Sequence, residues 1–222
     1  MSTGQKKRLS SIPAPESAPA SKMRLKDLRS EISALRRTLP NQPLPNQADE
    51  NENVIEPAPQ TMPTGGWPRL ASVLVEIAVH NVVLQQMTEA RSAAMDALIL
   101  LDMLEEDRRW ADLSLTLGEV LLALSEAHRA RERFDDAIAI FDEVGELESA
   151  ARARVGLARA MMMLRDPIGR AVLEDAGTLF EEIGDQDAAR VIDIELRELN
   201  AVLEESPASF QAVTPRTRVA KK

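Results

Sequence analysis

The stretch Ala137-Ile-Ala-Ile-Phe-Asp-Glu-Val-Gly145 returns later in the chain as Ala176-Gly-Thr-Leu-Phe-Glu-Glu-Ile-Gly184. The phenylalanines of the two copies, Phe141 and Phe180, are 39 residues apart, and so are the two final glycines. A period of this length is typical of helical repeats, in which each unit buries its apolar face against its neighbours. Because the glycines follow apolar residues, we predict that each one ends its helix in the left-handed conformation.

The composition favours an all-α protein. Of the 222 residues, 44% are hydrophobic but only 3% are aromatic, so the core must consist mainly of aliphatic side chains and alanine. Alanine and leucine are strong helix formers, and small side chains let helices approach closely. Apolar residues at helical spacing predict helices near residues 68–85, 88–105, 109–131, 135–144, 149–165, 169–183 and 186–204.

Composition and charge divide the chain into five segments. We predict a disordered basic tail (1–20), a short amphipathic helix (21–39), a Pro-rich linker (40–66), a folded repeat domain (67–205) and a second disordered basic tail (206–222). The net charge of −9 hides this partition, because both ends are basic while the repeat domain is acidic.

The amphipathic segment has one apolar row, at alternating steps of three and four residues: Leu25, Leu28, Ile32, Leu35 and Leu39. This spacing predicts a helix with Ser21 as its N-cap and Pro40 just beyond its end. The row covers barely two heptads, which is too short for a stable coiled coil on its own. Two interpretations stay open: a transient helix, or a docking helix that binds either a partner or this chain's own groove.

The sequence has few groups that suit catalysis or metal binding. It contains no cysteine, only two histidines (His80 and His128), and no glycine-rich phosphate loop. Glu76 is the only acidic residue at helical spacing from His80, whereas a metal site would need a third ligand. We therefore expect a protein that is not an enzyme, with no catalytic residues, no metal and no cofactor.

Neither a membrane span nor a secretory signal is predicted. No stretch approaches the roughly eighteen uninterrupted apolar residues of a membrane helix, and no apolar run follows the N-terminal residues. These features, together with the lack of cysteine, favour a soluble protein of the cytoplasm.

Three parts of the repeat domain share a pattern of small and large residues on paired helices. The pattern is Leu121-x-x-Leu124-Ser125-x-x-His128 followed by Ala137-x-x-x-Phe141-x-x-Val144, with further copies at Leu74-x-x-Ile77-Ala78-x-x-Asn81 and at Leu157-Ala158-x-x-Met161 with Ala176-x-x-x-Phe180-x-x-Ile183. Over residues 67–205 it resembles the tetratricopeptide repeat, a pair of antiparallel helices with Ala-x-x-x-Phe-x-x-Ala-like spacing on the second. The first-helix Trp, Gly and Tyr of that family's consensus are replaced at the matched positions. The resemblance implies a short right-handed α-solenoid of about three units with a C-terminal capping helix.

The resemblance also implies a function. In that family, partners lie in a concave groove lined by the first helix of each pair, so we expect an adaptor or scaffold that binds a peptide or helix of another protein. Projected onto this chain, the groove is lined by Val75, Val79, Val83, Leu122, Glu126, Arg129, Arg152, Val155, Arg159 and Met162. Arginine suits a partner with an acidic group, because its guanidinium binds a carboxylate through two hydrogen bonds. Alternatively, these arginines pair with neighbouring acids such as Glu126 and Glu148.

The basic ends suggest a different function, that of a regulatory or nucleic-acid-associated protein. The run Lys6-Lys7-Arg8 and the basic helix at 22–37 have the charge that binds phosphate backbones. However, the acidic domain would repel a nucleic acid, and the basic segments lack aromatic residues on which bases could stack. The adaptor function is therefore preferred over this alternative.

Overall fold

The structure, a computed structural model, describes residues 18–39, 66–104 and 107–205, and these form eight helices and no strand. The helices are α1 (Ala18–Thr38), α2 (Trp67–Val83), α3 (Met87–Leu101), α4 (Arg108–Ala123), α5 (Ala127–Val144), α6 (Leu147–Met163), α7 (Gly169–Ile183) and α8 (Gln186–Glu205). The prediction of an all-α protein is confirmed. Most of the predicted linker and both predicted tails lie outside the described residues, but residues 18–20 form the first turn of α1 rather than part of a tail. Pro19 fits there because a proline is tolerated in the first turn of a helix.

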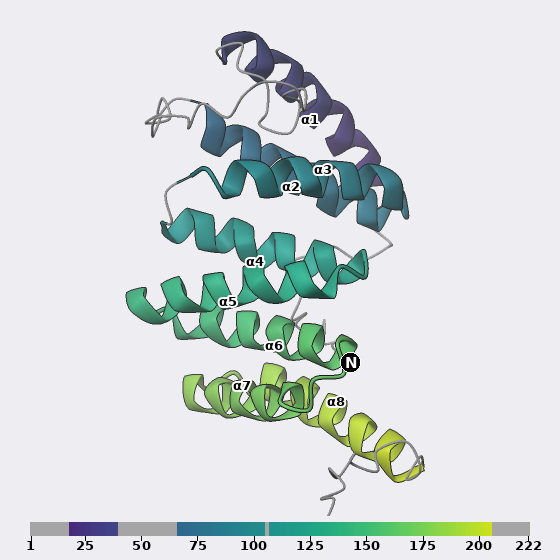
Figure 1. The fold of residues 1–222 in the computed structure, drawn as a ribbon, viewed down its shortest axis with the longest axis vertical. Helices are drawn as coiled ribbons and strands as arrows, with labels where there is room; N and C mark the ends of the chain where they lie inside the picture. The colour runs from purple at the N-terminus through teal and green to yellow at the C-terminus, as the bar shows by residue number, and fades with distance from the viewer. Residues whose placement is uncertain (1–17, 40–65, 105–106, 206–222) are drawn as a thin grey trace, which may run out of the picture.

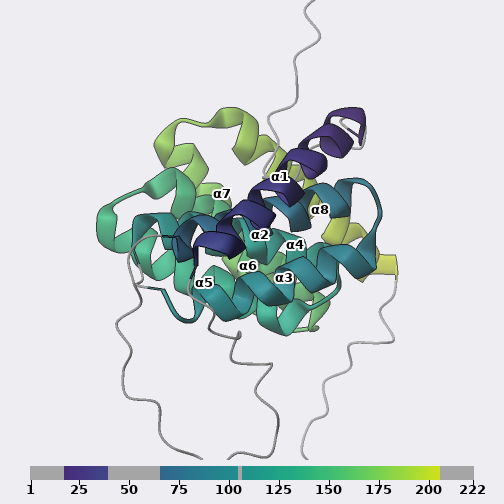
Figure 2. The same ribbon diagram turned by 90° about the horizontal axis from the view of Figure 1, so that it is seen from above.

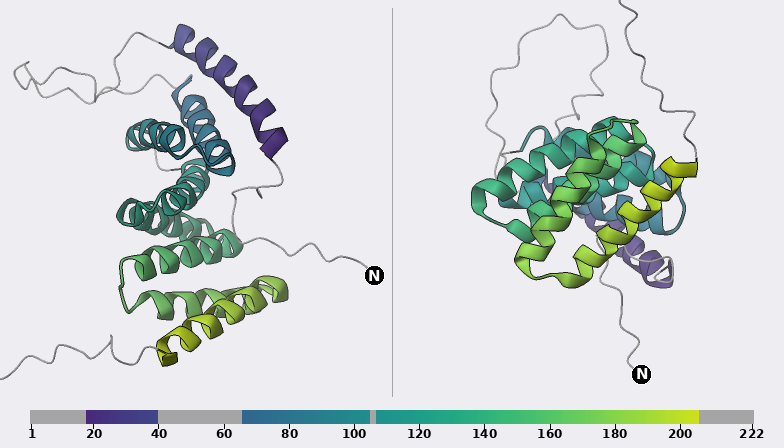
Figure 3. Two further views of the ribbon diagram at one scale, coloured as in Figure 1. Left: turned by 90° about the vertical axis from the view of Figure 1, so that its right-hand side faces the viewer. Right: turned by 90° about the horizontal axis from the view of Figure 1, so that it is seen from below.

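Each helix packs against the next one along the chain, from α1 to α8. Figure 1 shows the resulting stack, with α1 at one end and α8 at the other. The left view in Figure 3 shows the same succession of layers from the side. Helix α4 also contacts both α2 and α6, so these three alternate helices form a row within the stack.

The apolar core consists of two clusters. The larger cluster joins buried residues of α1 to α6, and the smaller one joins α6, α7 and α8. Three phenylalanines, Phe134, Phe141 and Phe180, are the largest fully buried side chains among the described residues. Most of the other buried residues are alanine or aliphatic, as the composition requires.

Phe134 of α5 sets the spacing of α4 and α6. A Cβ atom placed on Gly118 of α4 would lie 2.7 Å from its ring, and one placed on Gly156 of α6 would lie 2.4 Å from it. The ring therefore occupies space that any side chain at these two glycines would need. Two backbones approach one buried aromatic ring, which is how small residues permit close helix packing.

The turns between helices repeat at a regular interval. The only non-glycine residues with positive φ in the described part of the chain are Gln85, Ser125 and Arg165. Successive members of this set are 40 residues apart. Each one follows the end of a helix, α2, α4 and α6 in turn. Gly145 and Gly184 take the same left-handed conformation at the ends of α5 and α7, which confirms their predicted role.

The turn at Ser125 corrects the predicted helices 109–131 and 135–144. Helix α4 ends at Ala123, and α5 runs from Ala127 to Val144 without a break. The predicted match from Leu121 to His128 therefore spans a turn instead of lying on one helix. The error arose because the left-handed residue is a serine, and glycine is the usual signal for that conformation.

The left-handed turns lead to a paired prediction about stability. Ser125→Gly should raise the free energy of unfolding by about 0.5–1 kcal/mol, because glycine adopts positive φ without steric cost. Gly145→Ala should lower it by about 1 kcal/mol through the reverse effect, since a Cβ there would meet nothing within 4 Å and only the backbone is strained. Urea denaturation of the two variants measures both changes. Equal effects of the same sign would contradict a role for backbone strain.

Candidate functional site

A hollow of about 320 Å³ lies between α4 and α6. It is lined by Glu119, Leu122 and Ala123 of α4 and by Arg152, Gly156, Arg159 and Met163 of α6. Ala123 and Gly156 contribute only small groups to the lining, while Leu122 and Met163 supply apolar surface. The hollow therefore combines an apolar lining with charged groups, the combination found in ligand sites.

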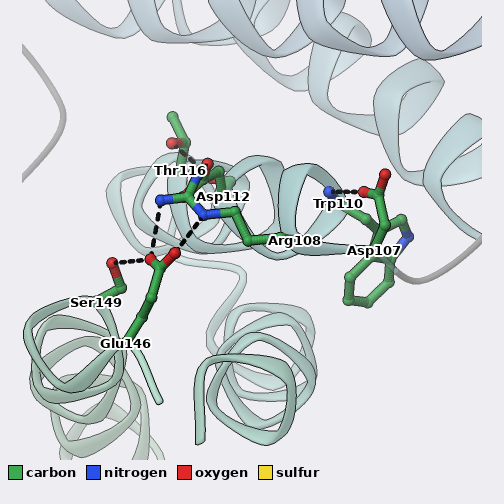
Figure 4. Close-up of polar contacts among 7 residues, drawn as sticks. All are labelled: Asp107, Arg108, Trp110, Asp112, Thr116, Glu146 and Ser149. Atoms are coloured by element: carbon green, nitrogen blue, oxygen red, sulfur yellow. Dashed lines mark hydrogen bonds and ion pairs between the residues drawn. The ribbon is translucent and has the colours of Figure 1, made fainter. Parts of the chain in front are cut away.

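The two helices that form the hollow are also fixed at their N-terminal ends. Arg108 at the start of α4 donates hydrogen bonds from Nε and Nη2 to the two carboxylate oxygens of Glu146, at 2.6 and 2.8 Å. Figure 4 shows this pair, with Asp112 also bound to Arg108 and with Ser149 donating to Glu146. The interaction ties α4 to the residue that precedes α6 and so holds the two helices side by side.

The charges of the hollow are matched in pairs. Arg159 donates to both carboxylate oxygens of Glu195 on α8, at 2.9 and 2.7 Å, and this hydrogen bonding raises the pKa of Arg159. Arg152 lies 4.0 Å from the carboxylate of Glu119, a residue that is only 9% exposed. Two arginines thus face two carboxylates, and the Arg159–Glu195 pair links α6 to α8.

Three of the predicted groove residues line the hollow: Leu122, Arg152 and Arg159. Sequence reasoning missed Glu119, Ala123, Gly156 and Met163, which also line it. The spacing of Gly118 and Gly156 could have revealed the register of α4 on α6, because both glycines meet the same ring.

The other predicted groove residues lie elsewhere. Val75, Val79 and Val83 are 2%, 7% and 7% exposed, and Val155 is fully buried, so none of them offers an open groove wall. The three valines are buried because α2 packs against α1, α3 and α4 at once. Met162 is partly buried and packs against the smaller cluster.

Glu126 and Arg129 also fall outside the hollow, because α4 ends before them. Glu126 precedes α5, and its carboxylate lies 2.9 Å from Arg91 of α3 and 3.1 Å from Arg129. For Arg129, this arrangement agrees with the alternative interpretation of the sequence, in which the groove arginines pair with neighbouring acids such as Glu126. For Arg159 the partner is Glu195 and not a residue close in sequence.

The predicted docking helix lies on α2. Figure 2 shows α1 crossing over the end of the stack next to α2, which it contacts. Leu25 and Leu28 are 4% and 0% exposed, and the other members of its apolar row are partly buried against the larger cluster: Ile32, Leu35 and Leu39. The apolar row predicted from sequence therefore faces the rest of the protein.

Polar contacts flank this row. Arg24 binds both carboxylate oxygens of Glu76, at 2.6 and 2.9 Å, and Arg69 binds Glu31 at 2.6 Å. The prediction that Ser21 is the N-cap of this helix is wrong, because α1 begins at Ala18. Its buried hydroxyl oxygen lies 3.0 Å from Nδ1 of His80 instead.

The contact between α1 and α2 should weaken in acid. Burial lowers the pKa of His80 below its ordinary value of 6.5, and the hydrogen bond from Arg24 lowers the pKa of Glu76 below 4.5. Both groups bind protons more readily when α1 is detached, so stability falls as the pH drops below about 6.5 and falls further below 4.5. The free energy of unfolding, measured at pH 7.5 and pH 5.5, should decrease in the wild type. A decrease of the same size in His80→Gln would contradict the role of His80.

The described residues place no group of three or more His, Asp or Glu side chains where they could hold a metal ion. His80 has an acidic neighbour, Glu76, whose carboxylate is 3.8 Å from Nε2. His128 is exposed on α5. None of the helices in the described part of the chain has the length and apolar character needed to cross a bilayer.

A search against protein-family models found no match to the chain, and a search of curated proteins found none either.

Proposed function

We propose that residues 67–205 form a tetratricopeptide-like solenoid of stacked antiparallel helix pairs, and that it acts as a non-catalytic adaptor in the cytoplasm. In this proposal, a peptide or helix of another protein binds in the hollow between α4 and α6. The observation that carries the proposal is the hollow itself, with an apolar lining and two arginines on one wall.

The repeat spacing supports the architecture. Left-handed turn residues recur at positions 85, 125 and 165. On the second helix of each pair, three buried residues recur with the same spacing of four and then three, although the set on α7 lies one residue closer to its turn: Ala90, Ala94 and Ala97 on α3, Ala130, Phe134 and Ala137 on α5, and Gly169, Leu173 and Ala176 on α7. The copy on α5 matches the Ala-x-x-x-Phe-x-x-Ala spacing of the family, in a register seven residues earlier than the one predicted from Phe141. Helix α8 would then be the capping helix.

The chemistry of the hollow indicates what kind of partner it would accept. An apolar side chain fits between Leu122 and Met163, where burial would contribute most of the binding free energy. An acidic group fits beside Arg152 and Arg159, where it would replace Glu195 in a bidentate pair. Such an exchange of carboxylates contributes more to specificity than to affinity.

The basic N-terminal region gives weaker support to the alternative nucleic-acid function. Arg24, in the described part of that region, is already engaged by Glu76. Burial raises the pKa of Asp96, and the charge of Arg36 partly opposes that rise, so Arg36 also acts on a carboxylate of this chain. A nucleic acid would have to displace these internal partners before it could use the same charges.

Selection of peptides from a random phage-displayed library on the full-length protein tests the adaptor function. We expect the selected peptides to share an apolar residue near an acidic one. Arg152→Glu and Met163→Asp should each weaken binding at least tenfold. Arg197→Glu is the matched control, because its side chain is 75% exposed on α8 and does not line the hollow. If no peptide is selected, or if all variants bind equally well, the proposed site is wrong.

A further inference from the structure

Helix α1 is attached to the protein differently from the other described helices. Successive helices from α4 to α8 are separated by two to five residues, whereas residues 39–66 lie between α1 and α2. Helix α1 also lies at the end of the stack, where it packs chiefly on α2 (Figure 1). It could therefore leave without opening a gap between two other helices.

The contact between α1 and α2 has a defined register. Ser21 meets His80, Arg24 meets Glu76 and Glu31 meets Arg69, so the two helices run in opposite directions. Between these polar contacts lie the two buried leucines of α1. The residues of α1 that make these contacts form the pattern Arg-Leu-x-x-Leu-x-x-Glu at positions 24–31.

We propose that this face of α2 is a second docking site, distinct from the hollow between α4 and α6. Its ligand is an amphipathic helix of another protein that carries the pattern Arg-Leu-x-x-Leu-x-x-Glu, and α1 is a resident copy that this helix replaces. Charge complementarity argues for such a ligand: the face presents a carboxylate at Glu76 and a guanidinium at Arg69, one for each end of the pattern. This mode of binding is the packing of an amphipathic helix into an apolar groove.

The covalent connection determines how strongly α1 competes. A tethered ligand acts at an effective concentration of about 1 mM, so a contact with a Kd of about 10 µM would be closed in roughly 99% of molecules. By the same arithmetic, a free helix of equal intrinsic affinity would bind about 100-fold more weakly to the intact protein than to the uncovered face. A partner helix must therefore bind the face of α2 more tightly than α1 does, or be present at high concentration, to displace α1.

The test uses the full chain with a protease site inserted between residues 45 and 60, before and after cleavage. The probe is a fluorescently labelled synthetic peptide of residues 18–39, followed by fluorescence anisotropy. We expect the probe to bind the cleaved protein at least tenfold more tightly than the uncleaved one, while far-UV circular dichroism shows that the rest of the protein stays folded. Failure of the probe to bind the cleaved protein, or unfolding of the protein when α1 is displaced, would overturn the proposal.

Charge reversal tests the register. A peptide with Arg24→Glu and Glu31→Arg should bind at least tenfold more weakly to the cleaved wild type. It should recover on a cleaved protein with Glu76→Arg and Arg69→Glu. Equal binding of both peptides to both proteins would mean that the face holds any apolar helix, which contradicts the proposal.

Two further measurements distinguish this site from the hollow and from a self-association surface. Arg152→Glu should leave binding of the probe unchanged, so that failure of the adaptor function and failure of this proposal are distinguishable. Light scattering of the uncleaved protein over a range of concentrations should show no dimer. A dimer abolished by Leu28→Asp would identify a second copy of the chain as the occupant and would overturn the assignment to another protein.

Discussion

Replacing Phe134 with alanine should lower the free energy of unfolding by about 3–5 kcal/mol, the cost typical of a fully buried phenylalanine. The effect should fall at the upper end of that range because the ring fills space against the backbones of both α4 and α6. Neither helix can close the cavity with a side chain of its own, since Gly118 and Gly156 have none. Urea denaturation followed by circular dichroism measures the loss.

A second substitution shows whether the ring and the glycines act together. Gly156→Ala alone should destabilise the protein by about 1–2 kcal/mol, because the added Cβ would collide with the ring of Phe134. In the Phe134→Ala background the same change should be neutral or stabilising by up to about 1 kcal/mol, since alanine favours the helix and the collision is gone. Additive effects in the double variant would contradict this packing. Leu147→Ala, at an exposed position, is the matched control.

The Phe134→Ala variant also bears on function. The hollow lies between the same two helices whose separation the ring maintains. We therefore expect this variant to bind peptides selected on the wild type at least tenfold more weakly, even at temperatures where it stays folded. Unchanged binding would place the peptide site away from α4 and α6.

Replacing Trp110 with alanine should have the next largest effect, also about 3–5 kcal/mol. Its side chain is 5% exposed, and its Nε1 donates a hydrogen bond of 2.8 Å to the carbonyl of Leu101 at the end of α3. The guanidinium of Arg133 lies 5.6 Å from the ring centroid, within range of a cation–π contact. One side chain therefore joins α4 to both α3 and α5.

Trp110→Phe separates the contribution of the indole hydrogen bond to the free energy of unfolding from that of apolar burial. Phenylalanine keeps most of the apolar volume but removes one of the two hydrogen bonds that the carbonyl of Leu101 accepts and leaves only the one from the backbone N–H of Leu104, so we expect a loss of about 0.5–1.5 kcal/mol. Denaturation followed by circular dichroism measures both variants. Trp67 stays available as a fluorescent reporter, since it is 6% exposed at the start of α2. A Phe variant as unstable as the Ala variant would show that the hydrogen bond dominates.

Several parts of the fold follow directly from local sequence patterns. The helical class follows from composition, and the ends of α5 and α7 follow from Gly145 and Gly184, because glycine is the residue that most readily adopts positive φ. The break after α4 does not follow, since Ser125 gives no such signal and adopts the left-handed conformation only because α5 must turn back onto α4.

The candidate site could be predicted only in part, because the predicted register, meaning the assignment of which residues of each helix face the groove, was only partly right. Leu122, Arg152 and Arg159 were assigned to the groove and line the hollow. Val75, Val79 and Val83 were assigned to the same surface, but they are buried because α2 has neighbours on more sides than a groove helix would have. A pattern of apolar residues on one helix does not reveal which neighbour covers each face.

The sequence by itself determined the helical class, the repeat of about forty residues and the apolar row of residues 25–39. These are local properties, because backbone propensity and the spacing of apolar side chains act within a few turns of one helix. Only the tertiary structure decided that α1 lies on α2, that Arg159 pairs with Glu195, and that Phe134 separates α4 from α6. Those outcomes depend on which distant surfaces bury the most apolar area while still satisfying the charges between them, and that choice is made among whole helices.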